Sequence, residues 1–460
     1  MNLTNALIAG SLLALLVPLP IVAQTADAVA RRYPDHARLM HYVDAQGREH
    51  PVGDRNDWKH RRAHILLGMQ AAMGPLPDRG QLPAVDIKYT PEKLSGQGFV
   101  RETLTFPMEA GDRVPADLYL PMPRPADQKL PAMLALHPTG ALGKRILAGE
   151  GPRINRQYGV ELAQRGYVVL CPDFPSFGDY SYDFQDDDYV SGTMKGVANH
   201  MRCVDLLQSL PFVDADRIGV IGHSLGGHNA MFVGAFDERL KVVVSSCGWT
   251  PFHDYYNGQI AGWTSDRYMP RLRDVYQMNA DLVPFDFYEV IAALAPRPFF
   301  SSSPVNDGNF SVAGVKKAIP KASQVYALFK ASDHLQVPYP TCGDDFPTEV
   351  REQAYTFIDN ALQHEPKTSL DFSAELPRIA PLEVDAALKS FTTLPEFEMQ
   401  LTAAEPLITD PVAMSFDKAG RLYVVEMRDY SEQDSERLGR IRLLEDTTGD
   451  GRFDRSSIFA

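Results

Sequence analysis

The chain has 460 residues and a formal net charge of −14, with 44% hydrophobic and 23% charged residues. This composition is that of a globular protein with a substantial core, and it excludes a fibrous or largely disordered chain. The excess of negative charge also argues against nucleic-acid binding, which depends on clustered lysine and arginine side chains. The length predicts two or three structural units.

Residues 7–22 are the one long apolar run of the sequence, and they include Pro18 and Pro20. Such a run at the N-terminus, followed by small residues, is typical of a secretory signal, which we expect over residues 1–28. The protein is therefore expected to be secreted or periplasmic, without a transmembrane span once the signal is removed. The first basic residue is only Arg31. An uncleaved anchor helix is the alternative, and the two prolines disfavour it.

Residues 29–98 are polar and rich in His, Arg and Pro, and we expect them to wrap a catalytic domain that spans residues 99–363. Within that domain, apolar strands alternate with amphipathic helices. The expected strands are residues 99–106, 116–120, 132–136, 167–171, 217–221, 242–246, 297–302 and 324–329. Long helical connections between strands predict an α/β fold: a mainly parallel sheet of about eight strands, covered by helices on both faces.

An aromatic-rich stretch, residues 248–295, separates the sixth and seventh expected strands. A long insertion on the ligand side of a sheet usually forms a lid or a pocket wall. The sequence leaves this role and the packing of the aromatic side chains on one another equally open.

The character of the chain changes after residue 363. Residues 364–398 contain several prolines and are expected to be a linker, and residues 399–460 contain three short expected strands: 412–416, 421–426 and 441–444. Three antiparallel strands of this length are marginally stable on their own. We therefore expect this segment to be part of a larger β structure that is truncated here.

The strongest motif is Gly222-His223-Ser224-Leu225-Gly226, which lies between an apolar strand and a stretch compatible with a helix. Its glycines allow a sharp turn that exposes the serine at the end of the strand. A helix N-terminus at the same point provides free N–H groups that stabilise negative charge. We predict that Ser224 is a nucleophile; the alternative is a serine that caps a helix.

A serine nucleophile needs a base, usually a histidine oriented by a carboxylate. After a strand–turn–helix nucleophile, the acid and then the base are expected, each beyond a later strand. Asp307 follows residues 297–302, and His334 follows residues 324–329. The predicted triad is therefore Ser224, His334 and Asp307, with Asp286 and Asp333 as alternatives for the acid.

Stabilisation of the oxyanion requires N–H donors. Leu225 supplies the first, and the loop after residues 132–136 supplies a second from Thr139 or Gly140, because Pro138 has no N–H.

Other candidate ligands are weaker. Cys171, Cys203, Cys247 and Cys342 do not have the spacing of a metal site, and the sequence leaves disulfides and buried free thiols equally open. The acidic run 186–188 is expected to be a solvated loop rather than a cation site. Residues 446–454 contain the oxygen ligands and glycine of a Ca²⁺ loop but lack its closing acidic residue.

The Gly222-to-Gly227 turn, the His137-Pro138-Thr139-Gly140 loop, and Asp307 with His334 together resemble the α/β-hydrolase superfamily over residues 99–362. Within it, the chain is most similar to dienelactone hydrolases and acetylxylan esterases, with some likeness to prolyl-oligopeptidase catalytic domains. The resemblance implies ester hydrolysis without a cofactor or a metal. Dienelactone hydrolases use a cysteine nucleophile, so Ser224 favours the esterase side. The motif Asp410-Pro411-Val412-Ala413-Met414, residues 420–430 and the Asp-rich loop give residues 391–460 a second likeness. This segment resembles the first blade of the propellers of planctomycete-type membrane-bound dehydrogenases.

Three functions are compatible with these observations. The favoured one is a secreted serine hydrolase that cleaves small or carbohydrate-linked carboxylic esters through an acyl-enzyme. A serine peptidase of the prolyl-oligopeptidase kind is the second, and a non-catalytic binding module attached to a propeller is the third. The sequence does not indicate the oligomeric state.

Overall fold

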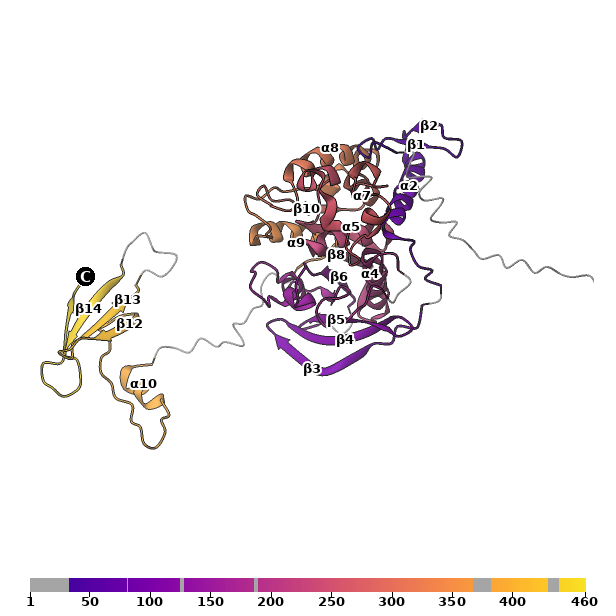
Figure 1. Ribbon diagram of the computed structural model, residues 1–460. Helices are drawn as coiled ribbons and strands as arrows, with labels where there is room; N and C mark the ends of the chain where they lie inside the picture. Colours follow the sequence, from indigo (N-terminus) through magenta and orange to yellow (C-terminus); the bar gives the residue numbers. More distant parts are fainter. Residues whose placement is uncertain (1–32, 81, 125–127, 186–188, 367–381, 429–437) are drawn as a thin grey trace, which may run out of the picture. The chain divides into compact units, whose positions relative to one another are not determined.

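The computed structural model describes residues 33–460 except 81, 125–127, 186–188, 367–381 and 429–437 (Figure 1). The chain divides into two compact units, whose described parts are residues 33–366 and 382–460. The expected signal over residues 1–28 and the acidic run 186–188 lie outside the described residues. Among the residues that are described, no helix has the length and apolar character needed to cross a membrane.

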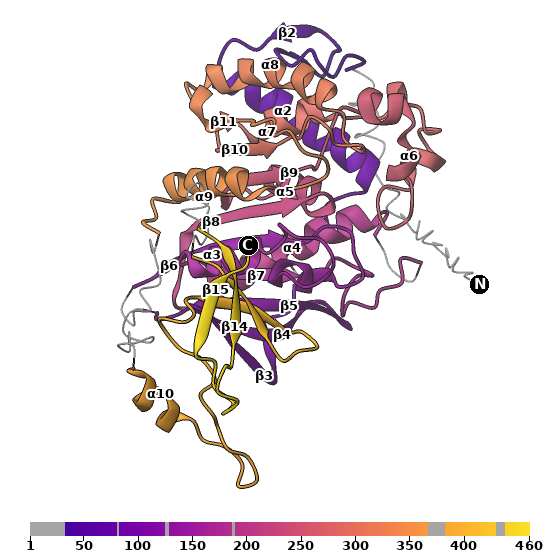
Figure 2. The same ribbon diagram turned by 90° about the vertical axis from the view of Figure 1, so that its left-hand side faces the viewer.

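The first unit is built on a nine-stranded sheet with the order β11-β10-β9-β8-β6-β7-β5-β4-β3 (Figure 2). Strands β6 to β11 pair in parallel, whereas β3, β4 and β5 form an antiparallel extension that joins the sheet at β7. The strands are β3 (Lys88–Gly96), β4 (Phe99–Glu109), β5 (Asp112–Pro121), β6 (Leu130–Leu136), β7 (Val168–Pro172), β8 (Val213–His223), β9 (Leu240–Ser246), β10 (Phe299–Ser302) and β11 (Leu335–Gln336). A mainly parallel sheet is thus present, as predicted.

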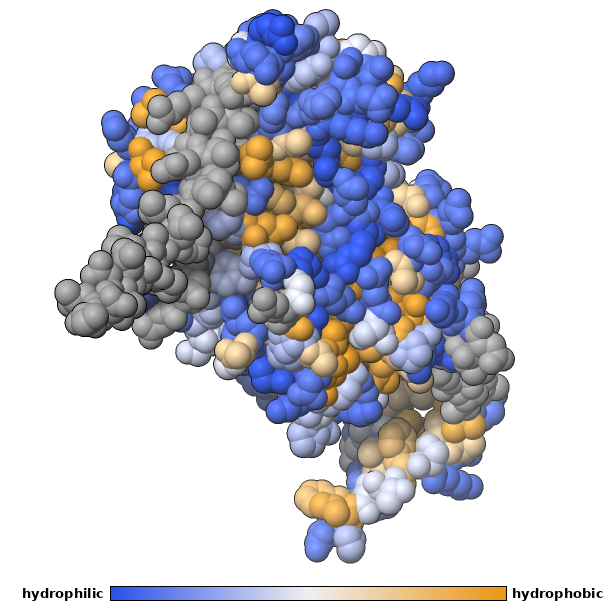
Figure 3. Space-filling model, turned by 90° about the vertical axis from the view of Figure 1, so that its right-hand side faces the viewer, coloured by the Kyte–Doolittle hydropathy of each residue, from blue (hydrophilic) through white to orange (hydrophobic). Residues whose placement is uncertain are grey.

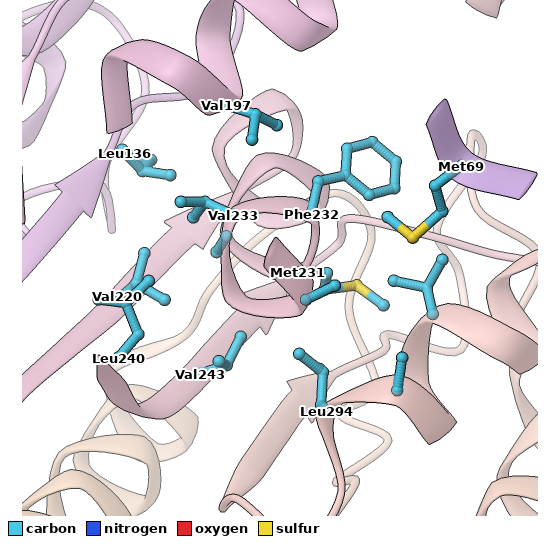
Figure 4. Close-up of a cluster of buried hydrophobic side chains, with 14 of the residues drawn as sticks. Met69, Leu136, Val197, Val220, Met231, Phe232, Val233, Leu240, Val243 and Leu294 are labelled. Carbon is cyan, nitrogen blue, oxygen red and sulfur yellow. The ribbon is translucent and has the colours of Figure 1, made fainter. Parts of the chain in front are cut away.

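Helices cover both faces of this sheet, because its central strands are apolar on both sides. One hydrophobic core includes side chains of α2 (Arg55–Met73), α4 (Gly192–Ser209), α5 (Leu225–Phe236), α7 (Phe287–Leu294) and α8 (Val312–Leu328). The core on the other face includes side chains of α3 (Tyr158–Gln164) and α9 (Thr348–Leu362). Figure 4 shows the first core around α5, where Met69 of α2 points toward Phe232.

Two strand predictions need correction. Residues 324–329, expected as the last strand, instead lie mostly in α8, and the last strand of the sheet is the two-residue β11. A continuous apolar run does not distinguish a buried strand from a buried helix. Strand β3 was missed because its sequence, Lys88–Gly96, has little apolar alternation.

The N-terminal segment packs on the first unit through α2, after a small hairpin of β1 (His41–Val43) and β2 (Glu49–Pro51). The buried Arg61 of α2 pairs with Glu289 of α7, and the His36 Nδ1 atom lies 2.8 Å from the same carboxylate. These buried ionic contacts join the N-terminal segment to helix α7.

The second unit contains a four-stranded antiparallel sheet in chain order: β12 (Pro411–Phe416), β13 (Leu422–Glu426), β14 (Arg440–Glu445) and β15 (Arg455–Ile458). Three of these strands were predicted, and β15 was not. A short helix, α10 (Val384–Ser390), precedes the sheet. The Asp446 carboxylate, a candidate Ca²⁺ ligand, accepts the N–H groups of Gly449 and Gly451 within the β14–β15 loop.

Candidate active site

The turn between β8 and α5 holds Ser224 in a strained backbone conformation. Its φ and ψ angles are 54° and −115°, which side chains other than glycine rarely adopt. A Cβ atom on Gly222 would overlap with the backbone of Gly226, and one on Gly226 would overlap with the carbonyl group of Leu136. The two glycines therefore permit the close approach that lifts Ser224 out of the strand, as the motif predicts.

The register of the sheet brings several loops to the edge where Ser224 lies. Leu136 of β6 pairs with Gly222, and His223 pairs with Ser246 of β9. Ser246 pairs in turn with Ser302, the last residue of β10. The segments that follow β6, β8, β9 and β10 thus all emerge at the same carboxyl edge, where ligands of parallel sheets bind.

Ser224 lines a pocket of about 490 Å³, a size within the range typical of small-molecule sites. The pocket is lined by Pro138, Thr139, Gly140, Ala141, Leu142, Ile146, Glu150, Gly151, Pro152, Arg153, Arg156, Ser224 and Asp344. No residue of the 248–295 insertion, all of which is described, is among them. Of the two roles that the sequence left open for the insertion, the structure shows the second: rings such as Phe252, Trp263 and Phe287 pack on one another in the core.

Backbone N–H groups without an acceptor among the described residues lie in the turn of Ser224 and in the pocket lining. Within the described chain, no protein group accepts the N–H of Leu225, Thr139 or Gly140. Leu225 is the first residue of α5, and the other two residues line the pocket. The loop that carries them is braced by His137, whose Nδ1 lies 2.7 Å from the Pro138 carbonyl oxygen and whose Nε2 accepts the Phe174 N–H at 2.9 Å.

Asp307 follows β10 at the same edge of the sheet. Its Oδ1 accepts the N–H groups of Asn309 at 2.8 Å and Phe310 at 3.1 Å. Burial raises the pKa of the carboxyl group; the Cys247 thiol, a weak donor, bonds to it, and its buried Oδ2 accepts no N–H or O–H group among the described residues. One carboxylate oxygen of Asp307 is therefore available to a further donor. The alternative acid Asp286 instead caps α7 by accepting the Phe287 N–H.

The structure contradicts the prediction that His334 is the base. His334 lies just before β11, in which Leu335 pairs with Phe299 at the start of β10. Its Nδ1 is 2.6 Å from the carbonyl oxygen of Pro296, which precedes β10. His334 and its neighbour Asp333 are therefore at the opposite edge of the sheet from Ser224. The error follows from the misplaced last strand, because His334 precedes the true strand instead of following it.

The segment that does follow β11 runs beside the Asp307 loop. The N–H groups of Ser303, Val305 and Asn306 donate to the carbonyl oxygens of Pro338, Pro340 and Cys342, at 3.1, 3.0 and 3.1 Å. This ladder carries the chain to Asp344, which lines the pocket with Ser224. Sequence reasoning missed Asp344, because nothing in the sequence marks an aspartate in this position.

Hydrogen bonds hold the Asp344 carboxylate in place. Its Oδ1 is 3.0 Å from His223 Nε2, and its Oδ2 accepts from Arg153 at 2.6 Å. The bond from His223 and the nearby arginines keep the pKa of Asp344 well below its usual range. His223 is buried, and burial lowers its own pKa. At neutral pH, Asp344 is thus an ionised carboxylate.

One group of donor atoms in this region has the composition of a metal site. Atoms of His223, Cys247 and Asp344 lie within 4.8 Å of one another. The His223 ring contacts Asp344, and the Cys247 thiol donates to the Asp345 carbonyl oxygen at 3.3 Å. Hydrogen bonds within the protein thus account for the cluster. All four cysteines are described and are free thiols, which settles the question that the sequence left open.

Two family models match parts of the chain. Residues 156–313 match the prolyl oligopeptidase family, and residues 383–460 match a domain of unknown function, DUF7133. The first match contains Ser224 and Asp307 and ends before β11.

Individual relatives extend the likeness over most of the first unit. The hydrolase YtaP of Bacillus subtilis is 26% identical over 306 residues, which are 63% of this chain and 96% of YtaP. Carbohydrate esterase MZ0003, from an unidentified prokaryote, is 24% identical over 321 residues, covering 58% of this chain and 73% of the esterase.

Among solved structures, a glucuronoyl esterase from Solibacter usitatus is similar in fold. Its TM-score is 0.57 at 20% identity, and the match covers 71% of this chain and 97% of the esterase. The first unit therefore has the α/β-hydrolase fold, and the relatives together support a serine ester hydrolase.

Proposed function

We propose that the protein hydrolyses carboxylic esters of carbohydrates, with Ser224 as the nucleophile. The observation that carries this proposal is the strained backbone of Ser224, at a strand–helix turn that opens into the pocket. Strain of this kind persists only where the surrounding structure enforces it, and it clusters at functional sites. The relatives that are named carbohydrate or glucuronoyl esterases support the choice of substrate class.

The proposed reaction has two balanced steps. The Ser224 Oγ atom bonds to the ester carbonyl carbon and gives up its proton, and the alcohol leaves with a proton as the C–O bond breaks. Water then attacks the acyl-enzyme, releasing the carboxylic acid and restoring the serine hydroxyl. In each step the N–H groups of Leu225 and of Thr139 or Gly140 stabilise the oxyanion, and each such donor contributes about 3 kcal/mol.

The pocket lining suits a polar substrate with some apolar surface. Arg153, Arg156 and Glu150 provide charged groups, and Leu142 and Ile146 provide apolar contact. A sugar ring offers both hydroxyl groups and C–H faces, so it complements such a mixed wall. Two ester classes fit this description: an acetylated sugar hydroxyl and an ester of a sugar carboxylate.

The test offers the full chain acetylated xylan, a methyl ester of glucuronate and 4-nitrophenyl acetate, beside its Ser224→Ala variant. We expect wild type to release product from at least one carbohydrate ester and the variant to fall to the uncatalysed rate. If the variant retains the wild-type rate, Ser224 is not the nucleophile.

A peptidase is the second candidate, since the prolyl oligopeptidase family model spans Ser224 and Asp307. A proline-linked peptide anilide belongs in the same panel. Cleavage of the anilide without cleavage of any ester would replace the esterase proposal by the peptidase.

The remaining proposals concern the ends of the chain. The apolar N-terminal run supports export to the periplasm or the medium. The antiparallel meander of β12 to β15 supports a propeller blade, which usually has four strands.

A further inference from the structure

The pocket around Ser224 contains no histidine among its described lining residues. The sequence has 12 histidines, and all of them lie in the described part of the chain. His137 and His223 are nearest in sequence to pocket residues, but their rings bond to Phe174, Pro138, Ser246 and Asp344. His228 is buried against Trp263, with ring centroids 4.8 Å apart, and burial lowers its pKa to about 3.

Candidates for the nucleophile and for the acid of a serine triad are nevertheless present. Ser224 opens into the pocket, and Asp307 has a buried carboxylate oxygen, Oδ2, to which no N–H or O–H group of the described chain donates; the Cys247 thiol is a weak donor to this carboxylate. In a serine triad the acid accepts a hydrogen bond from one nitrogen of an imidazole, and the other nitrogen takes the proton of the serine. Asp307 therefore has a carboxylate oxygen that no N–H group occupies, as expected where the imidazole of such a triad is missing.

Backbone hydrogen bonds join the segment that follows β10 to the segment that follows β11, and they identify the residue at the base position. Three backbone hydrogen bonds align residues 303–306 with residues 338–342, so the second segment passes directly beside Asp307. Its continuation, Asp344, interacts electrostatically with Asp307 and lines the pocket with Ser224. In the described chain, Asp344 is thus the titratable side chain that both lines the Ser224 pocket and interacts with Asp307.

We propose that residue 344 occupies the base position of this hydrolase and that Asp344, in place of an imidazole, makes it a slow esterase with an intact ester-binding pocket. This inference rests on the proposed function. When Ser224 attacks, its proton passes to the Asp344 carboxylate and from there to the leaving alcohol. Arg153 and His223 stabilise the ionised carboxylate, so it accepts a proton poorly.

The decisive variant is Asp344→His in the full chain. A positioned general base contributes about 10²- to 10⁴-fold, so we expect kcat/KM for 4-nitrophenyl acetate to rise by about 10²-fold or more. The pH profile should gain an ascending limb near the ordinary histidine pKa of about 6.5. Adding Asp307→Asn should remove most of this gain, because Asp307 would orient the new imidazole.

Asp345→His is the matched control, because Asp345 is the adjacent carboxylate and pairs with Arg156 at 2.7 Å. It should show no gain. A thermal melt of each variant shows that it is folded. A folded Asp344→His variant without a gain overturns the inference, and so does an equal gain from Asp345→His.

Chemical rescue provides a second route that does not depend on the folding of the histidine variant. Asp344→Gly opens a space at the base position, and added imidazole should then accelerate ester hydrolysis saturably. Asp344→Gly with Ser224→Ala measures the background reaction of imidazole itself. Equal acceleration with and without Ser224 would overturn the inference.

These outcomes separate the inference from the proposed function. A wild-type rate that Asp344→His does not raise, but that Ser224→Ala abolishes, leaves the esterase standing and removes the role of Asp344. If neither wild type nor Asp344→His cleaves any ester, the esterase proposal fails as well.

Discussion

The Nδ1 atom of His334 lies 2.6 Å from the carbonyl oxygen of Pro296, at the edge of the sheet where β10 begins. Ser224 lies at the opposite edge, after β8. The histidine that the sequence favours as the base therefore cannot reach the nucleophile, and its hydrogen bond is a local structural contact.

Replacing His334 by Ala is accordingly expected to leave ester hydrolysis within about twofold of wild type. The lost hydrogen bond should cost about 1 kcal/mol of stability or less, because the site is partly exposed. Steady-state rates and urea unfolding check both expectations. A loss of activity of 10²-fold or more would show that His334 does reach Ser224.

The strain at Ser224 predicts an unusual order of stability among its variants. Ser224→Gly and Ser224→Ala both remove the hydroxyl, but only glycine adopts a φ of 54° with a ψ of −115° freely. We expect the glycine variant to be more stable than the alanine variant by about 1 kcal/mol. Urea unfolding of the two proteins measures the difference. An alanine variant as stable as the glycine variant would mean that this turn stores no strain.

The close contact behind the nucleophile makes Gly226 hard to replace. A Cβ atom there would overlap with the carbonyl group of Leu136, so Gly226→Ala is expected to destabilise the first unit by about 3 kcal/mol. Gly308→Ala is the control, since nothing lies within 4 Å of a Cβ at that position and its change should be below about 0.5 kcal/mol. Equal effects of the two substitutions would contradict the packing described for the turn.

The contact between His36 and Glu289 predicts a dependence of stability on pH. Burial lowers the pKa of His36, but the charge of Glu289 and its hydrogen bond outweigh this and raise the pKa to about 9. Because this is above the unfolded value of 6.5, the stabilisation is complete below pH 6.5 and is lost as the pH rises through about 9.

His36→Gln should therefore flatten the fall in the free energy of unfolding over this pH range. The difference between the two proteins should change by at most about 3 kcal/mol, at 1.36 kcal/mol per pKa unit. Chemical unfolding at a series of pH values measures it. Parallel curves for wild type and variant would show that His36 is not coupled to Glu289.

The turn with Ser224 and the loop with Thr139 could be predicted because their local residue patterns agree with the fold. Ser224 could be located because strand, glycine turn and helix each have their own signal, and the loop with Thr139 follows an unmistakable apolar strand. The prediction of the triad base was wrong because β11 has only two residues, which are too few to show a strand pattern.

Because that strand was misplaced, the residue at the base position was predicted incorrectly. The apolar residues at the end of α8 have the sequence pattern of a strand. The sequence therefore predicts that His334 follows the last strand, whereas it lies just before β11. The role of the insertion could not be decided from the sequence, because aromatic residues indicate burial but do not indicate whether they lie in the core or in a pocket wall. Asp344 became visible only from the hydrogen-bond ladder beside Asp307.

The central claim is that Ser224 is a nucleophile facing a pocket lined with oxyanion donors. Its most direct test is prolonged incubation with a fluorophosphonate probe, followed by peptide mapping by mass spectrometry. We expect one covalent adduct on Ser224, formed slowly in wild type, faster in Asp344→His and not at all in Ser224→Ala. An adduct on another residue, or none in any variant, would contradict the claim.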